Sequence, residues 1–411
     1  MRLAMIVLVC GLVGCGGSST GGDDDGGPGG GDAAPSADAA YPGTGDDLDT
    51  ATGCPGVYNP DQVLAFHLTM SAGDWQTVQN DCTFLQYVPA QLSCGDGPAI
   101  QVGVRHKRSG GTMKPGLKID INQYVAGQEF YGLRKLDWEN GVGSAVDGCG
   151  SDGSSSGAML SEYLGWRLHV RSGEMTSRAA FVTVTVNGDD LGAFLSVEQV
   201  DKPFVGKRLG DASGWIWKFS GSPGDGQQTN LGVDDPYDDY FCFFAKNGCP
   251  MPSASQLAAD LPSHLNITQL LSVGAVNALM ANHDAIMLKL NNFIYYDYAG
   301  GPRAYFPWDL DTTMADDYDV YTGTVPGGTT VFTDALFSNW QDDYTTLLGD
   351  LLSGPLSLAN IDAEIDRGVT VAGPALEADP FVGGSAAAAG DDLKAWWATR
   401  HADVSAQVAA H

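Results

Sequence analysis

The order of the predicted elements places the folded part of this chain in the α+β class. Residues 62–70 alternate between apolar and polar side chains, as is typical of a half-buried strand, and strand-like stretches follow at 84–92, 99–106 and 116–122. The C-terminal part instead has helical spacing and ends in a helix that includes residues 391–404. Strands that come first and helices that come later, without regular alternation, predict an α+β fold.

Three helices interrupt or follow these strands. A short helix begins at Ser71, a residue type that commonly caps helix N-termini. A longer helix is predicted for residues 158–170, with Leu160, Leu164 and Leu168 on one apolar stripe. A third helix, at 267–281, leads into the most informative segment of the chain. The stretches between the elements are polar or rich in Gly and are predicted to be loops: 142–157, 221–262 and 320–331.

Two β-hairpins are also predicted. Asn187 and Gly188 separate two alternating runs, at 180–186 and 191–200, and an Asn-Gly pair in this position is a strong hairpin signal. The second hairpin lies within residues 281–314, where a Gly-Gly-Pro turn joins two strands rich in aromatic residues.

The N-terminus predicts an exported protein. An early Arg precedes a short apolar run that is interrupted too soon for a spanning helix, as in secretory signals. Residues 12–15, Leu-Val-Gly-Cys, match a lipobox, so Cys15 is expected to carry the lipid that anchors the chain to the cell envelope. An ordinary cleaved signal with an incidental Cys15 is the alternative. Gly16 and Gly17 after that cysteine favour the outer membrane or cell surface.

The predicted organisation has three parts. Residues 1–15 form the lipoprotein signal peptide, and residues 16–53, which contain almost no large apolar side chains, form a flexible linker. Residues 54–411 form one folded domain, which contains six cysteines. In an exported protein these predict disulfides, and the two pairs favoured by spacing are Cys242 with Cys249 and Cys82 with Cys94.

The charge balance excludes some partners. The chain has 50 Asp and Glu residues against 21 Lys and Arg residues, and its formal net charge is −29. Such a charge argues against nucleic acid and anionic membrane surfaces as partners. An anionic substrate such as a nucleotide would need a metal ion and local Lys or Arg residues to bind.

Acids and amides stand at the ends of the second hairpin. Asp284 precedes its first strand, Asn291 and Asn292 begin that strand, and Asp309 and Asp311 close the second strand. In an extended stretch Asp309 and Asp311 face the same side. Their carboxylate oxygens, together with the amide oxygen of either Asn291 or Asn292, suit Mg²⁺ or Mn²⁺. Phosphoryl transfer needs such a metal together with a group that positions the acceptor, a role for Asp284. His283 is a second choice of base, and a plain surface hairpin with acidic ends is the alternative.

Upstream residues complete a set suited to a nucleotide. Lys118 lies on a predicted strand and Glu162 on the helix at 158–170, in the chain order of the strand lysine and helix glutamate of protein kinases. Lys114 competes with Lys118 for this role. After the first hairpin, Glu198 and Asp201 are candidates to bind a base or ribose, or simply to cap the following turn.

The combined pattern resembles the CotH (spore coat protein H) family of atypical, kinase-like secreted proteins. The resemblance covers about residues 60–315 and is carried by Asn282-His-Asp284, by Asn291-Asn-Phe-Ile-Tyr-Tyr and by Phe306-Pro-Trp-Asp-Leu-Asp311. It implies a two-lobed protein-kinase-like fold, with an antiparallel-sheet N-lobe and a more helical C-lobe. It also implies ATP with Mg²⁺ or Mn²⁺ as the cofactor.

By position, the resemblance makes Asp284 the catalytic aspartate and Asn291 and Asp309 metal ligands, with Asp311 two residues further on. Lys118 and Glu162 become the pair that positions the phosphates. The sequence departs from the family pattern at Ala281, where a Gly is frequent, at Leu290, where a His is frequent, and around Arg108 and Ser109 in the polar loop.

We therefore expect a monomeric, exported, lipid-anchored protein kinase that transfers the γ-phosphate of ATP to Ser or Thr of secreted or surface proteins. The membrane is expected to be a partner only through the N-terminal lipid. A catalytically silent surface or adhesion module on the same scaffold is the alternative. A third possibility, a calcium-stabilised protein associated with polysaccharide, depends on the acidic clusters at 234–239 and 316–319.

Overall fold

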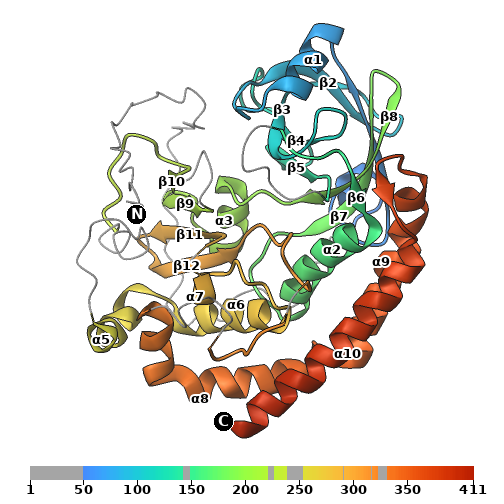
Figure 1. Cartoon of the computed structure of the whole chain (residues 1–411). Helices are drawn as coiled ribbons and strands as arrows, with labels where there is room; N and C mark the ends of the chain where they lie inside the picture. Colours follow the sequence, from blue (N-terminus) through green and yellow to red (C-terminus); the bar gives the residue numbers. More distant parts are fainter. Residues whose placement is uncertain are drawn as a thin grey trace, which may run out of the picture.

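The computed structural model describes residues 50–141, 149–220, 226–237, 253–289, 291–315, 317–322 and 331–411. Seven strands close into a barrel in the order β1-β2-β3-β4-β5-β8-β7 (Figure 1). Neighbouring strands are antiparallel except β1 and β7, which are parallel with Leu64 opposite Val182. The barrel strands are β1 (Leu64–Thr69), β2 (Val88–Cys94), β3 (Ile100–Gly110), β4 (Pro115–Asp120), β5 (Lys135–Glu139), β7 (Ala179–Val186) and β8 (Asp189–Val197).

Alternation along the strands gives this barrel an apolar interior and a polar outer face. Val104, Leu117, Trp138 and Phe194 belong to the cluster that fills it. Because successive side chains of a strand point to opposite faces, the residues between them face outward. On β3, β4 and β5 these outward residues include Lys107, Lys118, Asp137 and Glu139.

A second, smaller sheet has the antiparallel order β10-β9-β11-β12. Its strands are β9 (Trp215–Phe219), β10 (Gly226–Gln227), β11 (Phe293–Tyr298) and β12 (Gly301–Pro307). The β11–β12 pair confirms the second predicted hairpin, and β7–β8 confirms the first. Asn187 and Gly188 have φ values of 54° and 91° at the β7–β8 turn, the left-handed conformation that this turn requires.

Helices cover the two sheets and join them. The longer ones are α1 (Ala72–Asn80), α2 (Ser156–Arg171), α3 (Lys202–Leu209), α5 (Ala254–His264), α6 (Ile267–Leu279), α8 (Val331–Ser353), α9 (Leu358–Ala378) and α10 (Ala386–Ala410). Helices α9 and α10 lie side by side and run from the barrel to α8 (Figure 1). A two-stranded ladder of β6 (Ser154–Ser155) and β13 (Val382–Gly383) ties the start of α2 to the segment between α9 and α10.

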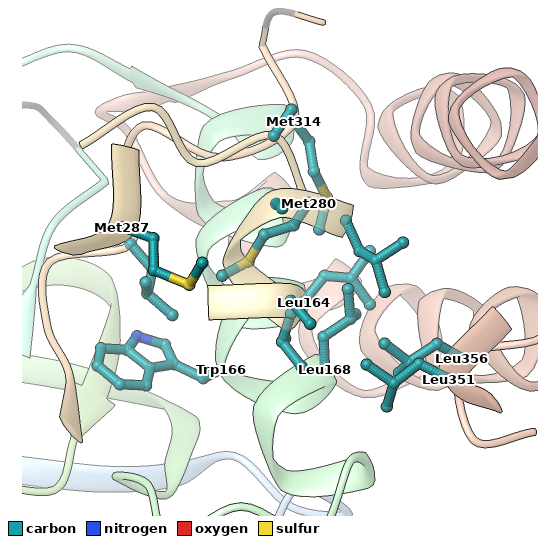
Figure 2. Packing of buried hydrophobic residues seen from close by; sticks show 14 of the residues in the cluster. Leu164, Trp166, Leu168, Met280, Met287, Met314, Leu351 and Leu356 are labelled. Carbon is teal, nitrogen blue, oxygen red and sulfur yellow. The ribbon is translucent and has the colours of Figure 1, made fainter. Parts of the chain in front are cut away.

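Helix α2 is the central element of the larger core. Its predicted stripe of Leu160, Leu164 and Leu168 is buried in the same cluster as residues of α6, α8, α9 and α10. Figure 2 shows Leu164 between Met280, at the end of α6, and Leu168. Burial of each such side chain contributes about 1.5–3 kcal/mol, so this cluster fixes α2 and α6 relative to each other.

The predicted two-lobed, kinase-like fold is wrong. Strand β1 pairs with β2 on one edge and with β7 on the other, so the strands assigned to an N-lobe sheet close into a seven-stranded barrel. Closure removes the free edges that an open sheet would have. The architecture is a closed barrel, a separate four-stranded sheet and a set of helices that packs on both.

The structure contains two disulfides among its described residues, Cys54–Cys94 and Cys82–Cys149. The predicted Cys82–Cys94 pair is therefore wrong, and Cys242 and Cys249 lie outside the described residues. Residues 1–49 also lie outside them, with the signal peptide, Cys15 and nearly all of the linker. None of the described helices is long and apolar enough to cross a membrane.

Candidate functional site

Four of the predicted acids converge although they come from three separate segments. Glu162 lies on α2, Asp284 follows α6, and Asp309 and Asp311 follow β12. Burial and the neighbouring Asp311 and Asp309 raise the pKa of Glu162 to about 8. Burial, Asp309 and Asp284 raise the pKa of Asp311 to about 7. These acids form one anionic cluster in which Glu162 is buried and the other three are half-buried. Such a cluster is typical of a functional site.

Asn282 connects two of these segments. Its side-chain Oδ1 accepts hydrogen bonds from the backbone N–H of Asp284, at 3.1 Å, and from the hydroxyl of Thr312, at 3.0 Å. Its Nδ2 donates to the side chain of Asn277 on α6 at 2.8 Å. Asn282 therefore fixes Asp284 relative to the turn that carries Asp311.

Strained backbone gathers in the same region. Of eight described non-glycine residues with positive φ, four lie between 281 and 314: Ala281 (53°), Asn292 (46°), Asp309 (57°) and Met314 (59°). Such conformations cost about 1–3 kcal/mol each and occur most often at active sites and ligand-binding segments. The left-handed conformation at Ala281 is one that Gly would adopt without steric cost.

The lysine whose charge acts most strongly on these acids is one that the sequence did not single out. Lys107, on the outer face of β3, forms ion pairs with Asp137, at 2.8 Å, and with Glu139. Its positive charge lowers the pKa values of Glu162, Asp309 and Asp311 against the effect of burial. In the sequence, Lys107 could have been recognised only because it lies two residues after Arg105, on the polar face of a strand whose other face is apolar.

The two predicted lysines have other contacts. Lys118 donates a hydrogen bond of 2.7 Å to the Gln199 side chain, and burial lowers the pKa of its ammonium group, an effect that the nearby Asp137 opposes. Lys114 is completely buried and forms an ion pair with Asp379, so it holds the start of β4 against the segment after α9. Of the two, Lys118 is the one linked to the acids, because Asp137 acts on the charge of Lys118 and also raises the pKa of Asp309.

A pocket lies beside Lys118 at the connector that follows β8. Its lining includes Lys118, Gln199, Val200, Gln228 and Thr229, which offer backbone and amide groups to a planar polar ligand. Lys118 acts on the charge of Asp137, and Asp137 forms an ion pair with Lys107, so charged side chains link this pocket to the acidic cluster.

Glu198 and Asp201, the other candidates on this connector, serve the fold. Arg178 donates hydrogen bonds of 2.9 and 2.8 Å to the two carboxylate oxygens of Glu198, and Arg208 donates one of 2.7 Å. Asp201 caps α3 by accepting a hydrogen bond from the backbone N–H of Phe204. We therefore assign Glu198 to a structural ion pair and Asp201 to the capping role that the sequence left open.

The acid sensitivity of the fold should depend on Glu198. Burial alone would raise its pKa, but Arg208 and Arg178 lower it to about 2. A folded-state pKa below the unfolded value gives stability that is present above about pH 4.5 and is lost as the pH falls toward 2. Glu198→Gln should lower the free energy of unfolding by about 3 kcal/mol at pH 7, and this difference from the wild type should become smaller below pH 4. Unfolding measured from pH 7 to 2.5 tests this, with Glu129→Gln, at a surface residue, as the control. A constant difference at all pH values would contradict it.

The arrangement suits a metal that takes only part of its ligands from the protein. Among the described residues, no group of three His, Cys, Asp or Glu side chains is placed to hold a metal by itself. Mg²⁺ commonly binds one or two carboxylates and completes its shell with water and substrate phosphates. Asp309 and Asp311 fit that pattern. Asn291 is half-buried, and Asn292, which directly precedes β11, is buried.

Comparison with known proteins gives one family. The family model described as CotH kinase protein matches residues 114–404, which is more than half of the chain. No curated protein matches the chain. The matched range begins just before β4 and includes Lys118, Glu162, Asp284, Asp309 and Asp311.

Proposed function

The chain belongs to the CotH kinase protein family, and on this premise we propose that it is a protein kinase. It transfers the γ-phosphate of ATP to Ser or Thr hydroxyls of secreted or surface proteins. It is exported and anchored to the cell envelope through a lipid on Cys15, most simply at the outer membrane or cell surface. This proposal places the phosphotransfer site in the region around Asp284, Asp309 and Lys107.

The observation that carries the proposal is the convergence of Asp284 with two further half-buried acids, Asp309 and Asp311. Burial raises the pKa values of both Asp309 and Asp311, and Asp284 adds to this increase. A buried cluster of like charges is unfavourable unless a cation compensates it. Phosphoryl transfer uses such a cation, and it also uses a carboxylate that accepts the proton of the acceptor hydroxyl.

Each residue then has a role. Asp309 and Asp311 would hold Mg²⁺ or Mn²⁺, with an amide oxygen from Asn291, and the bound metal supplies positive charge to the phosphates. Asp284 orients the acceptor hydroxyl and takes its proton. Lys107 provides a fixed ammonium group toward the phosphates.

Other residues bind the nucleotide or hold this set in place. The pocket beside Lys118 binds the base and ribose. Glu162 lies within electrostatic range of Lys107, and in its charged form it would hold that lysine on the side of the acids.

Labelled ATP tests the proposal directly. The purified full-length chain, with Mn²⁺ or Mg²⁺, should incorporate γ-phosphate into itself or into casein, and Asp284→Asn should reduce the rate by about 10²- to 10⁴-fold. Asp284→Asn keeps the size of the side chain and removes only its capacity to accept the proton. If the wild-type rate is no higher than that of Asp284→Asn, the chain is not a kinase.

A catalytically silent surface module remains the second candidate, favoured by the net charge of −29, which opposes the approach of ATP. Thermal unfolding with ATP and Mg²⁺ separates the two candidates. A ligand at a hundred times its dissociation constant adds about 2.7 kcal/mol of stability. An unchanged melting temperature would favour the silent module.

A further inference from the structure

A β-bulge lies at Lys107. The register of β3 against β4 breaks between His106 and Gly110, where three residues of β3, 107–109, lie opposite a single residue of β4, Gly116. A bulge bends its strand and changes the direction of its side chains, and bulges are frequent beside active sites. Lys107 is the first residue of this bulge, so its side chain need not follow the regular alternation of β3.

Gly116 leaves room for the Lys107 side chain to cross β4. The barrel order β3-β4-β5 places β4 between Lys107 and the acids of β5. A Cβ added at Gly116 would lie 3.4 Å from the Cβ of Lys107 and would clash with the Oγ of Ser109. A side chain at this position would therefore crowd the start of the path from β3 to β5.

Two acids of β5 hold the Lys107 ammonium group on the other side of β4. Nζ forms ion pairs with Oδ1 of Asp137, at 2.8 Å, and with Glu139. The side chains of Lys107, Asp137 and Glu139 are 16%, 2% and 13% exposed, so water screens these pairs little. Burial would raise the pKa of Asp137, but Lys107, and after it Lys118, lower that pKa below its usual value.

The same ammonium group lies beside the acidic cluster. It is 5.5 Å from the centre of the Trp308 ring, and Trp308 directly precedes Asp309. The ion pairs of Lys107 join it to β5 and not to Glu162 of α2. In protein kinases the site lysine pairs instead with a helix glutamate, and movement of that helix controls activity.

We propose that Asp137 is the positioning residue of Lys107: with Glu139 and the space at Gly116, it holds the ammonium group of the site on the barrel. This inference rests on the proposed kinase function and concerns the regulation of the same site. A lysine that is held within one sheet stays in place when a neighbouring helix moves. Any contribution from Glu162 is secondary, and movement of α2 does not switch the lysine in and out of the site.

Melting temperatures of the full-length chain without nucleotide test the pair directly. Lys107→Met should lower the melting temperature by about 5–10 °C, because Asp137 is left as a buried charge without its partner. In the Asp137→Asn background the same replacement should have less than half of this effect, since the buried charge is already gone. The matched control is Lys394 with Asp366, an ion pair whose aspartate is 65% exposed. Lys394→Met and Asp366→Asn should give small, additive shifts.

Binding of Mg-ATP tests whether the position of Lys107 matters to the site. Asp137→Asn should weaken this binding about tenfold. Loss of a negative charge alone would strengthen the binding of an anion, so a weaker affinity is the sign of a misplaced ammonium group. Gly116→Ala changes no charge and should also weaken binding several-fold. Gly349→Ala, at a position of α8 where an added Cβ meets its nearest atom at 3.8 Å, should leave it unchanged.

The outcomes separate this inference from the kinase proposal. Equal shifts for Lys107→Met in the two backgrounds would overturn the inference, and so would Mg-ATP binding by Asp137→Asn that is as tight as that of the wild type or tighter. If both expected results are obtained but the wild type transfers no phosphate, Asp137 still positions Lys107 and the kinase proposal fails.

Discussion

Replacement of Asp309 by asparagine should abolish phosphotransfer and, at the same time, stabilise the metal-free protein. Loss of a metal ligand removes several kcal/mol of transition-state stabilisation, so we expect a rate at least about 10³-fold lower. Desolvation raises the pKa of the half-buried Asp309, and Asp284 raises it further, despite the opposing charges of Lys107 and Lys218. A raised pKa means that the charged form is unfavourable in the fold at neutral pH, so its removal should increase stability.

Asparagine is the right substitution because Asp309 has a φ of 57°. Asn tolerates this left-handed conformation as well as Asp does, whereas Ala would add backbone strain. With EDTA present, Asp309→Asn should melt about 2–4 °C higher than the wild type, which corresponds to roughly 1 kcal/mol. Asp96→Asn, at an exposed turn, should leave both activity and melting temperature unchanged. A lower melting temperature for Asp309→Asn would mean that this charge is already compensated within the protein.

The two hairpins could be predicted from local sequence patterns because neighbouring residues determine where a hairpin turns and which of its faces is buried. The Asn187-Gly188 turn has the left-handed geometry that this pair favours, and the alternation on each side of it sets which face is buried. Barrel closure could not be predicted in this way. It depends on parallel pairing between β1 and β7, which are more than a hundred residues apart, and nothing in the pattern of either strand specifies that partner.

The acids of the site were predictable for the same local reason: they stand at the ends of a recognisable hairpin. The cations were not. Lys107 of β3 and Lys218 of β9 meet at Trp308 only through the tertiary arrangement of the chain. The sequence instead favoured Lys118, with Lys114 as its competitor. The role of Glu198 also depends on tertiary partners. Its ion pairs with Arg178 and Arg208 show that it stabilises the fold, and the sequence alone did not reveal them.

The C-terminal helix should control the position of Asp284 through one buried arginine. Arg400 of α10 is 1% exposed and donates to the backbone carbonyls of Ala278, at 2.6 Å, Leu279, at 3.2 Å, and Tyr318, at 2.6 Å. It also forms an ion pair with Asp317. The first two carbonyls belong to the C-terminal turn of α6, the negative end of the helix dipole, so the guanidinium group fixes the point from which the 281–284 segment departs.

Arg400→Met should therefore reduce both stability and turnover. It leaves buried carbonyls without their charged donor, at an expected cost of about 3–5 kcal/mol, or roughly 10 °C in melting temperature. Because the segment that carries Asp284 loses its anchor, kcat should fall about tenfold or more at temperatures where the variant is still folded. KM for ATP should change little, since Arg400 does not reach the pocket beside Lys118.

Tyr318→Phe distinguishes positioning from stability. Its hydroxyl donates a 3.0 Å hydrogen bond to the backbone carbonyl of Asn282, while its ring lies 5.2 Å from the Arg400 guanidinium. Loss of the hydroxyl alone should cost only about 1 kcal/mol of stability, because the ring contact remains. If Arg400 acts through Tyr318 and Asn282 on Asp284, this small change should still lower kcat several-fold without raising KM. A variant with full kcat would mean that Arg400 serves stability alone, and the loss in Arg400→Met should then follow only its unfolded fraction.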